Sequence, residues 1–185
     1  IHQVVDTFQT DLGIAITKVD STGNILWEKT DTIRTGYFGR FDLVVESDGF
    51  RIAGFRKNFP EFEHCLEMKK FNFSGEVVSE AKYTFPYKTD PEQVKILPDS
   101  SVIVFTNDEL DEVGKVYKFS SDASLLWERS YPDDGLYEAY YESVYLMPDG
   151  NILAVTTDLA FESTNEDNTT VTNFDALGNI LWQCF

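Results

Sequence analysis

The sequence predicts an all-β protein built from one repeated unit, a four-stranded antiparallel sheet. Three observations predict it: a segment that recurs about every 50 residues, a second turn motif with the same period, and short runs of Val, Ile, Phe and Tyr bounded by Gly, Asp and Pro. No segment shows a sustained helical period, so we predict no helix beyond at most one turn at Glu109–Val113.

The first recurring segment occurs four times and reads KVDSTGNILW, KFNFSGEVVS, KFSSDASLLW and NFDALGNILW. Its copies end at Trp27, Ser79, Trp127 and Trp182, which are 52, 48 and 55 residues apart. The second motif reads SDG, PDS and PDG, and its aspartates, Asp48, Asp99 and Asp149, are 51 and 50 residues apart. Two signals that share one period indicate a repeat protein.

Each repeat predicts two hairpins, because two turn motifs separate four β-rich runs. In the first tight turn, Asp20 can hydrogen-bond its own backbone and Gly23 can adopt the positive φ that a short turn needs. The other predicted turn residues are Asp48, Gly49, Gly75, Asp99, Asp149, Gly150 and Gly178. The predicted strands, in chain order, are Gln3–Phe8, Ile14–Val19, Asn24–Thr30, Arg40–Glu46, Phe50–Arg56, Cys65–Phe73, Glu76–Tyr83, Gln93–Leu97, Ser101–Thr106, Lys115–Phe119, Ser124–Ser130, Ser143–Met147, Asn151–Thr157, Thr169–Phe174 and Asn179–Cys184.

Many of the predicted strands are apolar on both faces, as Val102–Phe105 illustrates, so such strands must be packed between neighbouring sheets. Four-stranded sheets stacked face to face form a β-propeller, with a β-sandwich as the alternative fold. We expect a single domain, 1–185, with blades at about 1–31, 40–85, 92–131 and 141–185. The first blade is incomplete, so we expect a larger ring, with the remaining blades or another chain packed on the open blade faces.

Two segments, KVDSTGNILWEK at Lys18–Lys29 and DALGNILWQ at Asp175–Gln183, resemble the repeat of secreted bacterial β-propellers, lvKlDsnGnilWqktyGG. SDGFRIAGF at Ser47–Phe55 is similar to the DGGyilaG half of that repeat. The same residues also resemble the repeat of quinoprotein-type propellers. The resemblance implies a propeller fold and an exported or cell-surface location.

The quinoprotein-type resemblance implies that Trp27, Trp127 and Trp182 are wedges between blades. Two positions depart from the repeat. Ser79 replaces the tryptophan, so that wedge should be missing or supplied by Tyr83. Ala123 replaces the turn glycine, so Asp122 could take the left-handed conformation there.

Composition limits the functions that the chain can have. The 185 residues carry 32 acidic and 15 basic side chains, a net charge of −17, which disfavours nucleic acid and favours basic partners or cations. No apolar run reaches the length of a membrane span. Cys65 and Cys184 lack metal-ligand spacing, and we expect both to be buried thiols, because they lie in different repeats.

No motif specifies a reaction. The only histidines, His2 and His64, lie beside no nucleophile motif, and turn capping is sufficient to explain each turn aspartate. We therefore expect a non-catalytic protein with no cofactor and no metal site.

The loops opposite the tight turns are acidic and contain aromatic residues, which suits a protein partner with a basic or amphipathic surface. The predicted partner face consists of Asp108, Glu109, Asp111, Glu112, Tyr137, Tyr140, Glu162, Glu166 and Asp167. We expect a scaffold for protein–protein interaction in an exported or cell-surface assembly. The alternative is a carbohydrate-binding or quinoprotein-like enzymatic propeller whose site lies in further blades.

Overall fold

The computed structural model describes residues 2–5, 11–34, 37–58, 63–86, 89–108, 114–130, 137–160 and 168–184, and all regular elements in these ranges are strands. The strands are β1 (His2–Val5), β2 (Asp11–Val19), β3 (Ile25–Arg34), β4 (Tyr37–Glu46), β5 (Gly49–Asn58), β6 (Glu63–Asn72), β7 (Val77–Thr84), β8 (Thr89–Ile96), β9 (Val102–Asp108), β10 (Gly114–Phe119), β11 (Leu125–Ser130), β12 (Tyr137–Leu146), β13 (Ile152–Ala160), β14 (Asn168–Phe174) and β15 (Ile180–Cys184). In the same ranges, no helix has the length and hydropathy needed to cross a membrane.

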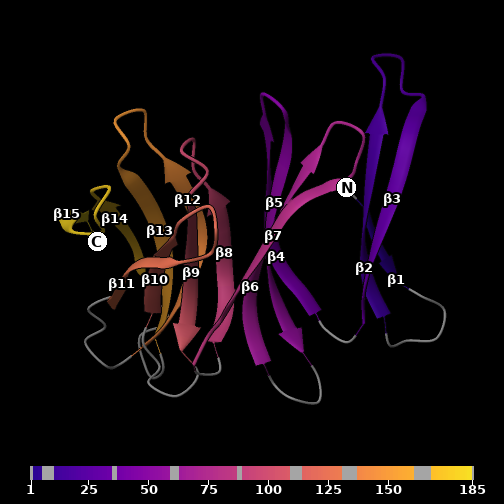
Figure 1. Ribbon diagram of the computed structural model, residues 1–185. Helices are drawn as coiled ribbons and strands as arrows, with labels where there is room; N and C mark the ends of the chain where they lie inside the picture. Colours follow the sequence, from indigo (N-terminus) through magenta and orange to yellow (C-terminus); the bar gives the residue numbers. More distant parts are fainter. Residues whose placement is uncertain are drawn as a thin grey trace.

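The strands form four antiparallel sheets in which every strand pairs with its neighbours in sequence. The first sheet has three strands, β1–β3, and the other three have four strands each: β4–β7, β8–β11 and β12–β15. The sheets stand side by side in chain order (Figure 1). The chain is therefore an all-β protein made of four-stranded antiparallel blades.

All fifteen predicted strands are present, but many extend further than expected away from the tight turns. β2 begins at Asp11 instead of Ile14, and β12 begins at Tyr137 instead of Ser143. Glu109–Val113, where a helical turn was allowed, lies outside the described residues.

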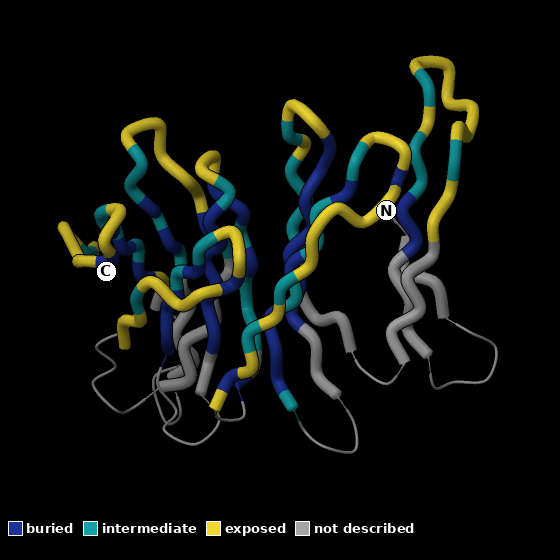
Figure 2. The backbone as a smooth tube through the Cα atoms, in the orientation of Figure 1, coloured by how far each residue is buried: buried dark blue, intermediate teal, exposed yellow. Residues whose placement is uncertain are grey.

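The hydrophobic core lies between the sheets (Figure 2). β9 shows why both of its faces had to be apolar. Val102 and Val104 pack into the cluster shared with the second blade, whereas Ile103 and Phe105 pack into the cluster shared with the fourth. All four side chains have 0% exposure, as expected for a strand with alternating faces between two sheets.

Three clusters join successive blades. Ile16 joins Phe50, Ile52 and Phe71 between the first and second blades. The second and third blades share the largest cluster: Ala53, Phe55, Leu66, Met68, Phe85, Val94, Ile96, Val102, Val104, Tyr117, Phe119 and Ala123. The third and fourth share Leu97, Ile103, Phe105, Val116, Val144, Ile152, Ala154 and Phe174.

The two cysteines differ in environment, and neither is in a disulfide. Cys65 is fully buried in β6, as predicted. Cys184 is exposed, so the prediction of burial is wrong for it. It lies near the end of β15, the outermost strand of the last sheet, which has no further sheet beside it among the described residues.

Candidate functional site

A β-bulge recurs in the hairpin formed by the last two strands of every blade. We call this hairpin, its turn and the last strand the outer hairpin, the outer turn and the outer strand. Lys18 pairs with Trp27 and Val19 pairs with Ile25, so Leu26 is an extra residue in β3. The same irregularity leaves Val78, Leu126 and Leu181 as extra residues in β7, β11 and β15. A bulge changes which way the following side chains point. It therefore sets the direction of the residue at the tryptophan position of each blade.

Two of the tryptophans lie against the outer turn of the next blade. The ring of Trp27 covers Gly75, where an added Cβ would lie 3.2 Å from two ring atoms, and its Nε1 donates to the Phe73 carbonyl at 3.1 Å. The ring of Trp127 covers Gly178, where an added Cβ would lie 2.8 Å from it. The turn glycine is thus both the left-handed residue of its own turn and the surface on which the indole packs.

The contact between the second and third blades is built differently. Ser79 stands at the tryptophan position, and Tyr83 contacts the next blade instead, with its ring centroid 4.8 Å from that of Phe119. The turn residue opposite is Ala123, which is buried and adopts φ 60°. The left-handed residue is therefore Ala123 itself, and the expectation that Asp122 takes this conformation is wrong.

Among the described residues, Trp182 does not lie between two sheets. No sheet follows β15 among the described residues, and the side chain is 46% exposed. The predicted inter-blade position is therefore not reached by this residue here, in contrast to Trp27 and Trp127.

The predicted turn aspartates serve mainly as caps, with one exception. Asp20 accepts hydrogen bonds from the side chains of Asn24 and Thr22 and from the backbone N–H groups of the same two residues. These bonds, the Asn24 side chain first, hold the pKa of Asp20 well below the usual range. Asp99, Asp149 and Asp175 accept from backbone N–H groups in the same way. Asp48 instead binds Lys70 Nζ at 2.9 Å.

The glycine of that exceptional turn also has a different role. Gly49 is the first residue of β5 and does not adopt positive φ. The four glycines that do adopt positive φ are Gly23, Gly75, Gly150 and Gly178. A Cβ at Gly49 would lie 1.9 Å from the Phe71 carbonyl oxygen. Glycine is needed there for the close approach of β5 to β6.

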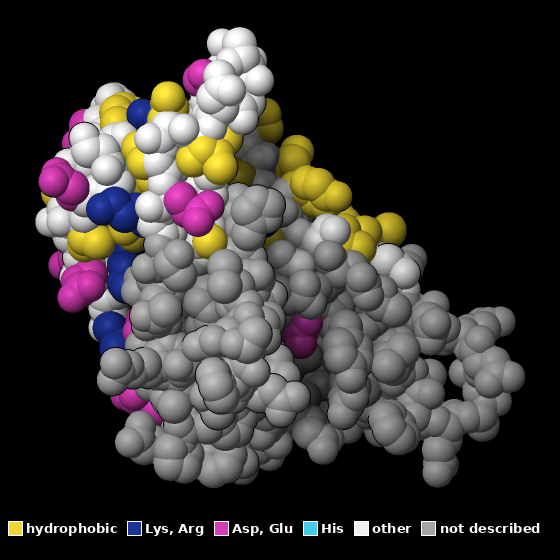
Figure 3. Space-filling view, turned by 90° about the vertical axis from the view of Figure 1, so that its right-hand side faces the viewer, with side chains coloured by type: hydrophobic (Ala, Val, Ile, Leu, Met, Phe, Trp, Pro, Cys, Tyr) yellow, Lys and Arg dark blue, Asp and Glu magenta, His cyan; other side chains and the backbone are white. Residues whose placement is uncertain are grey.

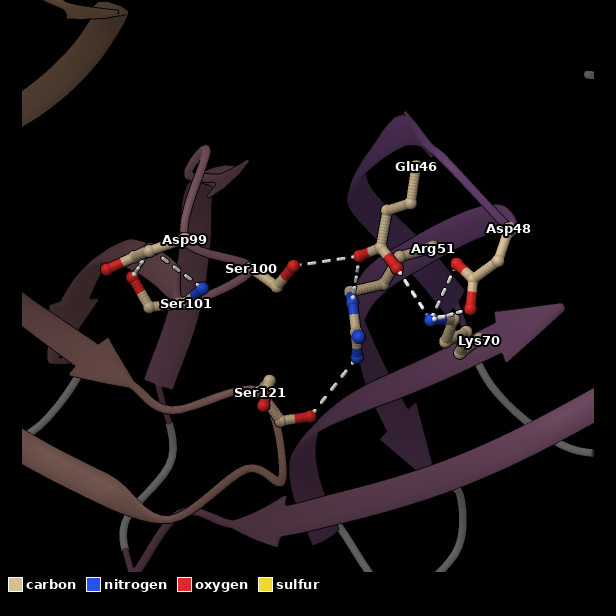
Figure 4. Close-up of polar contacts among 8 residues, drawn as sticks. All are labelled: Glu46, Asp48, Arg51, Lys70, Asp99, Ser100, Ser101 and Ser121. Carbon is tan, nitrogen blue, oxygen red and sulfur yellow. Dashed lines mark hydrogen bonds and ion pairs between the residues drawn. The ribbon is translucent and has the colours of Figure 1, made fainter.

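A polar network joins the second blade to two turns of the third (Figure 4). Glu46 accepts from Arg51 Nε at 2.9 Å and Ser100 Oγ at 2.8 Å, and pairs with Lys70 at 3.0 Å. Arg51 also donates to the Ser121 carbonyl at 3.2 Å. Burial alone would raise the pKa of Glu46, but these partners outweigh it and lower the pKa from 4.5 to about 2.

We predict that this network makes stability depend on acidity. Because the pKa of Glu46 is lower in the folded chain than its ordinary 4.5, its contribution is present above that pH and is lost as the pH falls toward about 2. Denaturant unfolding of the wild type and Glu46→Gln at about pH 7, 5, 4 and 3 measures this. The wild-type advantage should shrink by about 1–3 kcal/mol over this range. Parallel pH profiles for the two proteins would show that the carboxylate does not contribute through its charge.

Three members of the predicted acidic partner face are among the described residues, in strand segments away from the tight turns. Asp108 ends β9, and Tyr137 and Tyr140 belong to β12, so these three lie in strands and not in loops as expected. The other members, Glu109, Asp111, Glu112, Glu162, Glu166 and Asp167, lie outside the described residues. The prediction that this face binds a partner therefore stays a prediction.

Exposed apolar residues that were not predicted as a surface from the sequence lie at the start of the last strand of each blade, next to the tight turn. Immediately after its tight turn, each outer strand begins with two exposed aliphatic residues, 39–63% accessible to solvent. We call these eight residues the aliphatic rim: Ile25, Leu26, Val77, Val78, Leu125, Leu126, Ile180 and Leu181. The sequence signal was present, because paired aliphatic residues recur with the repeat period. That both residues of each pair are exposed could not be read from it.

Where the first blade faces outward, the described surface has mixed character. Hydrophobic side chains there are interspersed with Lys or Arg and with Asp or Glu (Figure 3).

Among the described residues, no group of three or more His, Cys, Asp and Glu is placed to hold a metal ion. The carboxylates of Asp20, Asp99 and Glu46 have structural partners within turns or between blades.

These sheets and their contacts define a β-propeller type of protein. No family model and no curated protein matches the sequence. The arrangement is similar to that in a mutant of Synechocystis apocarotenoid oxygenase, with 13% identity and a TM-score of 0.45. Two structures of ACO/RPE65 chimeras give 12% identity and TM-scores of 0.46 and 0.44. Each match covers 77% of this chain but 36% of the other, so the chain spans about a third of those proteins.

At these identities the likeness concerns the arrangement of sheets alone. The matches do not name the secreted bacterial repeat family that the sequence resembles, so the exported location that it implies remains a prediction.

Proposed function

We propose that this chain is a non-catalytic propeller scaffold that mediates protein–protein interaction in an exported or cell-surface assembly. The observation that carries the proposal is the aliphatic rim. Eight exposed aliphatic side chains recur at one position in all four blades, whereas isolated exposed apolar residues are ordinary on protein surfaces. A repeated apolar feature on a rigid scaffold is suited to a partner that contacts several blades at once.

The scaffold itself supports this role. The rim residues follow a tight turn and include the bulge. Backbone pairing holds the bulge, and capping side chains such as Asp20 and Asp175 hold the turn. A preorganised surface loses little conformational entropy on binding. The partner that fits is amphipathic: apolar groups for the rim and basic groups for the chain's net charge of −17, which steers association at a distance.

The test replaces the four bulge residues of the rim, Leu26, Val78, Leu126 and Leu181, by serine. These side chains are 52–60% exposed, so the fold should be retained. The matched control replaces by serine two residues outside the rim, Val45 and Tyr145. These two residues are 68% and 55% exposed. Circular dichroism and thermal melting establish folding for both variants.

Each protein is then used to recover crosslinked partners from the organism's envelope fraction, and the recovered proteins are quantified by mass spectrometry. A specific partner should be recovered at least about tenfold less by the rim variant, which corresponds to about 1.4 kcal/mol of binding free energy, and unchanged by the control. Equal recovery by the wild type and both variants would contradict binding through the rim.

A further inference from the structure

The contacts between successive blades in this chain are of two kinds. We call the contact between the outer hairpin of one blade and the outer turn of the next a joint. In the first kind of joint, a tryptophan packs on a turn glycine: Trp27 on Gly75 and Trp127 on Gly178. A Cβ added to these glycines would lie 3.2 and 2.8 Å from the indole ring, closer than the roughly 3.5–4.0 Å of a favourable carbon–carbon contact. These joints therefore require a turn residue without a side chain.

The second kind of joint connects the second blade to the third, and its turn has the same backbone. Ala123 occupies the glycine position, and like Gly75 and Gly178 it has positive φ. Its N–H donates to the Ser120 carbonyl at 3.0 Å, and the two glycines make the same bond within their own turns at the same distance. What distinguishes this position is the methyl group of Ala123, which is buried in the cluster shared by the two blades.

The second-blade half of this joint is changed to match. Ser79 stands at the tryptophan position and is exposed, so it does not cover the turn. Tyr83, further along β7, packs on Phe119 of the third blade instead, with 4.8 Å between the ring centroids. A small residue thus replaces the indole in the one joint where a methyl group replaces the glycine hydrogen.

A polar contact of this joint is changed as well. In the other two joints, a lysine of the preceding hairpin donates to the turn carbonyl two residues before the glycine, as Lys18 does to Phe73 at 3.1 Å. In the second blade, the corresponding Lys70 forms ion pairs within its own blade. The equivalent carbonyl, that of Ser121, accepts from Arg51 at 3.2 Å. The middle joint therefore differs from its neighbours in each of these three contacts.

The two kinds of joint do not accept each other's parts. A tryptophan on the third-blade turn would meet the Ala123 methyl group at about the 2.8–3.2 Å found for an added Cβ in the other two turns. Ser79 on Gly178 would leave the place of the indole unfilled, which costs stability. Because the two kinds alternate along the chain, an outer hairpin that skips one blade always meets the wrong turn.

Skipping a blade is an error that a repeat protein has to avoid, because similar units can pair with the wrong neighbour during folding. We propose that Ser79 and Ala123 form a matched pair that fixes the order of the blades. The Ala123 methyl group excludes the tryptophan of the first blade from the third-blade turn, so the specificity comes from a clash in the wrong pairing. This role does not rest on the proposed function of the aliphatic rim.

The experiment compares refolding of the wild type, Ala123→Gly and the double variant that combines Ala123→Gly with Ser79→Trp. Glycine adopts the φ of 60° without strain, so the turn is retained while it becomes open to tryptophan. The chains are diluted from denaturant to between about 1 and 50 μM, where misassembly competes with folding, and monomer is measured by size-exclusion chromatography. Both variants should yield several times less monomer than the wild type.

Ser100→Gly is the matched control for this comparison. Ser100 also has positive φ, 64°, and lies in the other turn of the third blade, between β8 and β9, away from the joint. The substitution removes a hydrogen bond to Glu46, yet it should recover monomer like the wild type.

A disulfide identifies the wrong pairing directly. The Lys29 side chain lies 3.2 Å from a Cβ added to Gly75, so a first-blade hairpin on the third-blade turn brings residue 29 close to Asp122. Lys29→Cys and Asp122→Cys are introduced together with Cys184→Ser, and the chain is refolded under oxidising conditions. In the native arrangement the two positions are two blades apart, about 20 Å at the usual sheet spacing, whereas a disulfide needs Cα atoms within about 7 Å. Lys29→Cys with Ser74→Cys is the corresponding native pair.

The disulfide between positions 29 and 122 should form several times more often with Ala123→Gly than without it. In addition, Ser79→Trp alone should melt at a lower temperature than the double variant, because its indole meets the Ala123 methyl group. Wild-type recovery of monomer by Ala123→Gly and the double variant, an equal loss in Ser100→Gly, a disulfide that does not depend on residue 123, or equal melting of Ser79→Trp and the double variant would each overturn the proposal.

Discussion

Replacing Trp127 by alanine is expected to lower the free energy of unfolding by roughly 3–5 kcal/mol, the range for removing a large aromatic side chain from a packed site. The indole lies between the third-blade hairpin and the Gly178 turn of the fourth blade, and packs against the cluster that joins these blades. Arg129 also lies over the ring, with its guanidinium carbon 5.7 Å from the ring centroid.

Trp182→Ala is the matched control, because it removes the same side chain from the same repeat position in the last blade. Its indole is 46% exposed, so the loss should stay below about 1 kcal/mol. Denaturant titration of both variants, at concentrations where the chain is monomeric, gives the comparison. Losses of similar size at Trp127 and Trp182 would show that Trp127 does not act as an inter-blade wedge.

The second large effect is expected at Gly49, where alanine should cost about 3 kcal/mol or more. Its added Cβ would lie 1.9 Å from the carbonyl oxygen of Phe71 and 2.9 Å from the carbonyl carbon. Both atoms belong to the backbone of β6, so relief requires the start of β5 to separate from the end of β6. Overpacking in a well-packed core costs about 1–3 kcal/mol, and a backbone obstacle is at the upper end.

Gly23→Ala is the control for this experiment. Its φ is +88°, where alanine is strained by about 1 kcal/mol, but nothing lies within 4 Å of the added Cβ. Alanine should therefore cost more stability at Gly49, whose φ is not positive, than at Gly23. Thermal melting of Gly49→Ala and Gly23→Ala tests this, and a smaller loss at Gly49 would refute the close approach of β5 to β6.

The repeat made most of the fold predictable from the sequence. A period near 50 residues, read from two motifs, placed all fifteen strands and the division into four-stranded sheets. Apolar runs on both faces of a strand, as in Val102–Phe105, correctly required sheets on both sides. Strand ends away from the tight turns were less predictable, because residues such as Asp11 and Tyr137 continue pairing despite weak β preference or polar neighbours.

The contacts between blades were only partly predictable. A repeated tryptophan indicates a repeated packing site, but the sequence does not show that Trp127 packs on Gly178 while Trp182 packs on no turn glycine in the described part of the chain. The replacement of the repeat's tryptophan by Ser79 and of its turn glycine by Ala123 was visible in the sequence. That the two departures face the same interface became evident only with the sheets in place.

The aliphatic rim escaped prediction because it depends on register. In a regular strand, adjacent residues such as Ile25 and Leu26 point to opposite faces, so one of them would be buried. The bulge opposite Lys18 and Val19 breaks this alternation, and both side chains are exposed. That both residues of each pair are exposed therefore became evident only from the structure.

The central claim is that the tryptophan of one blade packs on the outer turn of the next. Fluorine NMR of the protein labelled with fluorotryptophan tests it most directly, because the chain has only three tryptophans and each can be assigned by substitution with phenylalanine. A dissolved paramagnetic agent is added at a protein concentration where the chain is monomeric. We predict strong broadening of the Trp182 signal and much weaker broadening of the Trp27 and Trp127 signals. Equal broadening of all three signals would contradict the inter-blade packing described here.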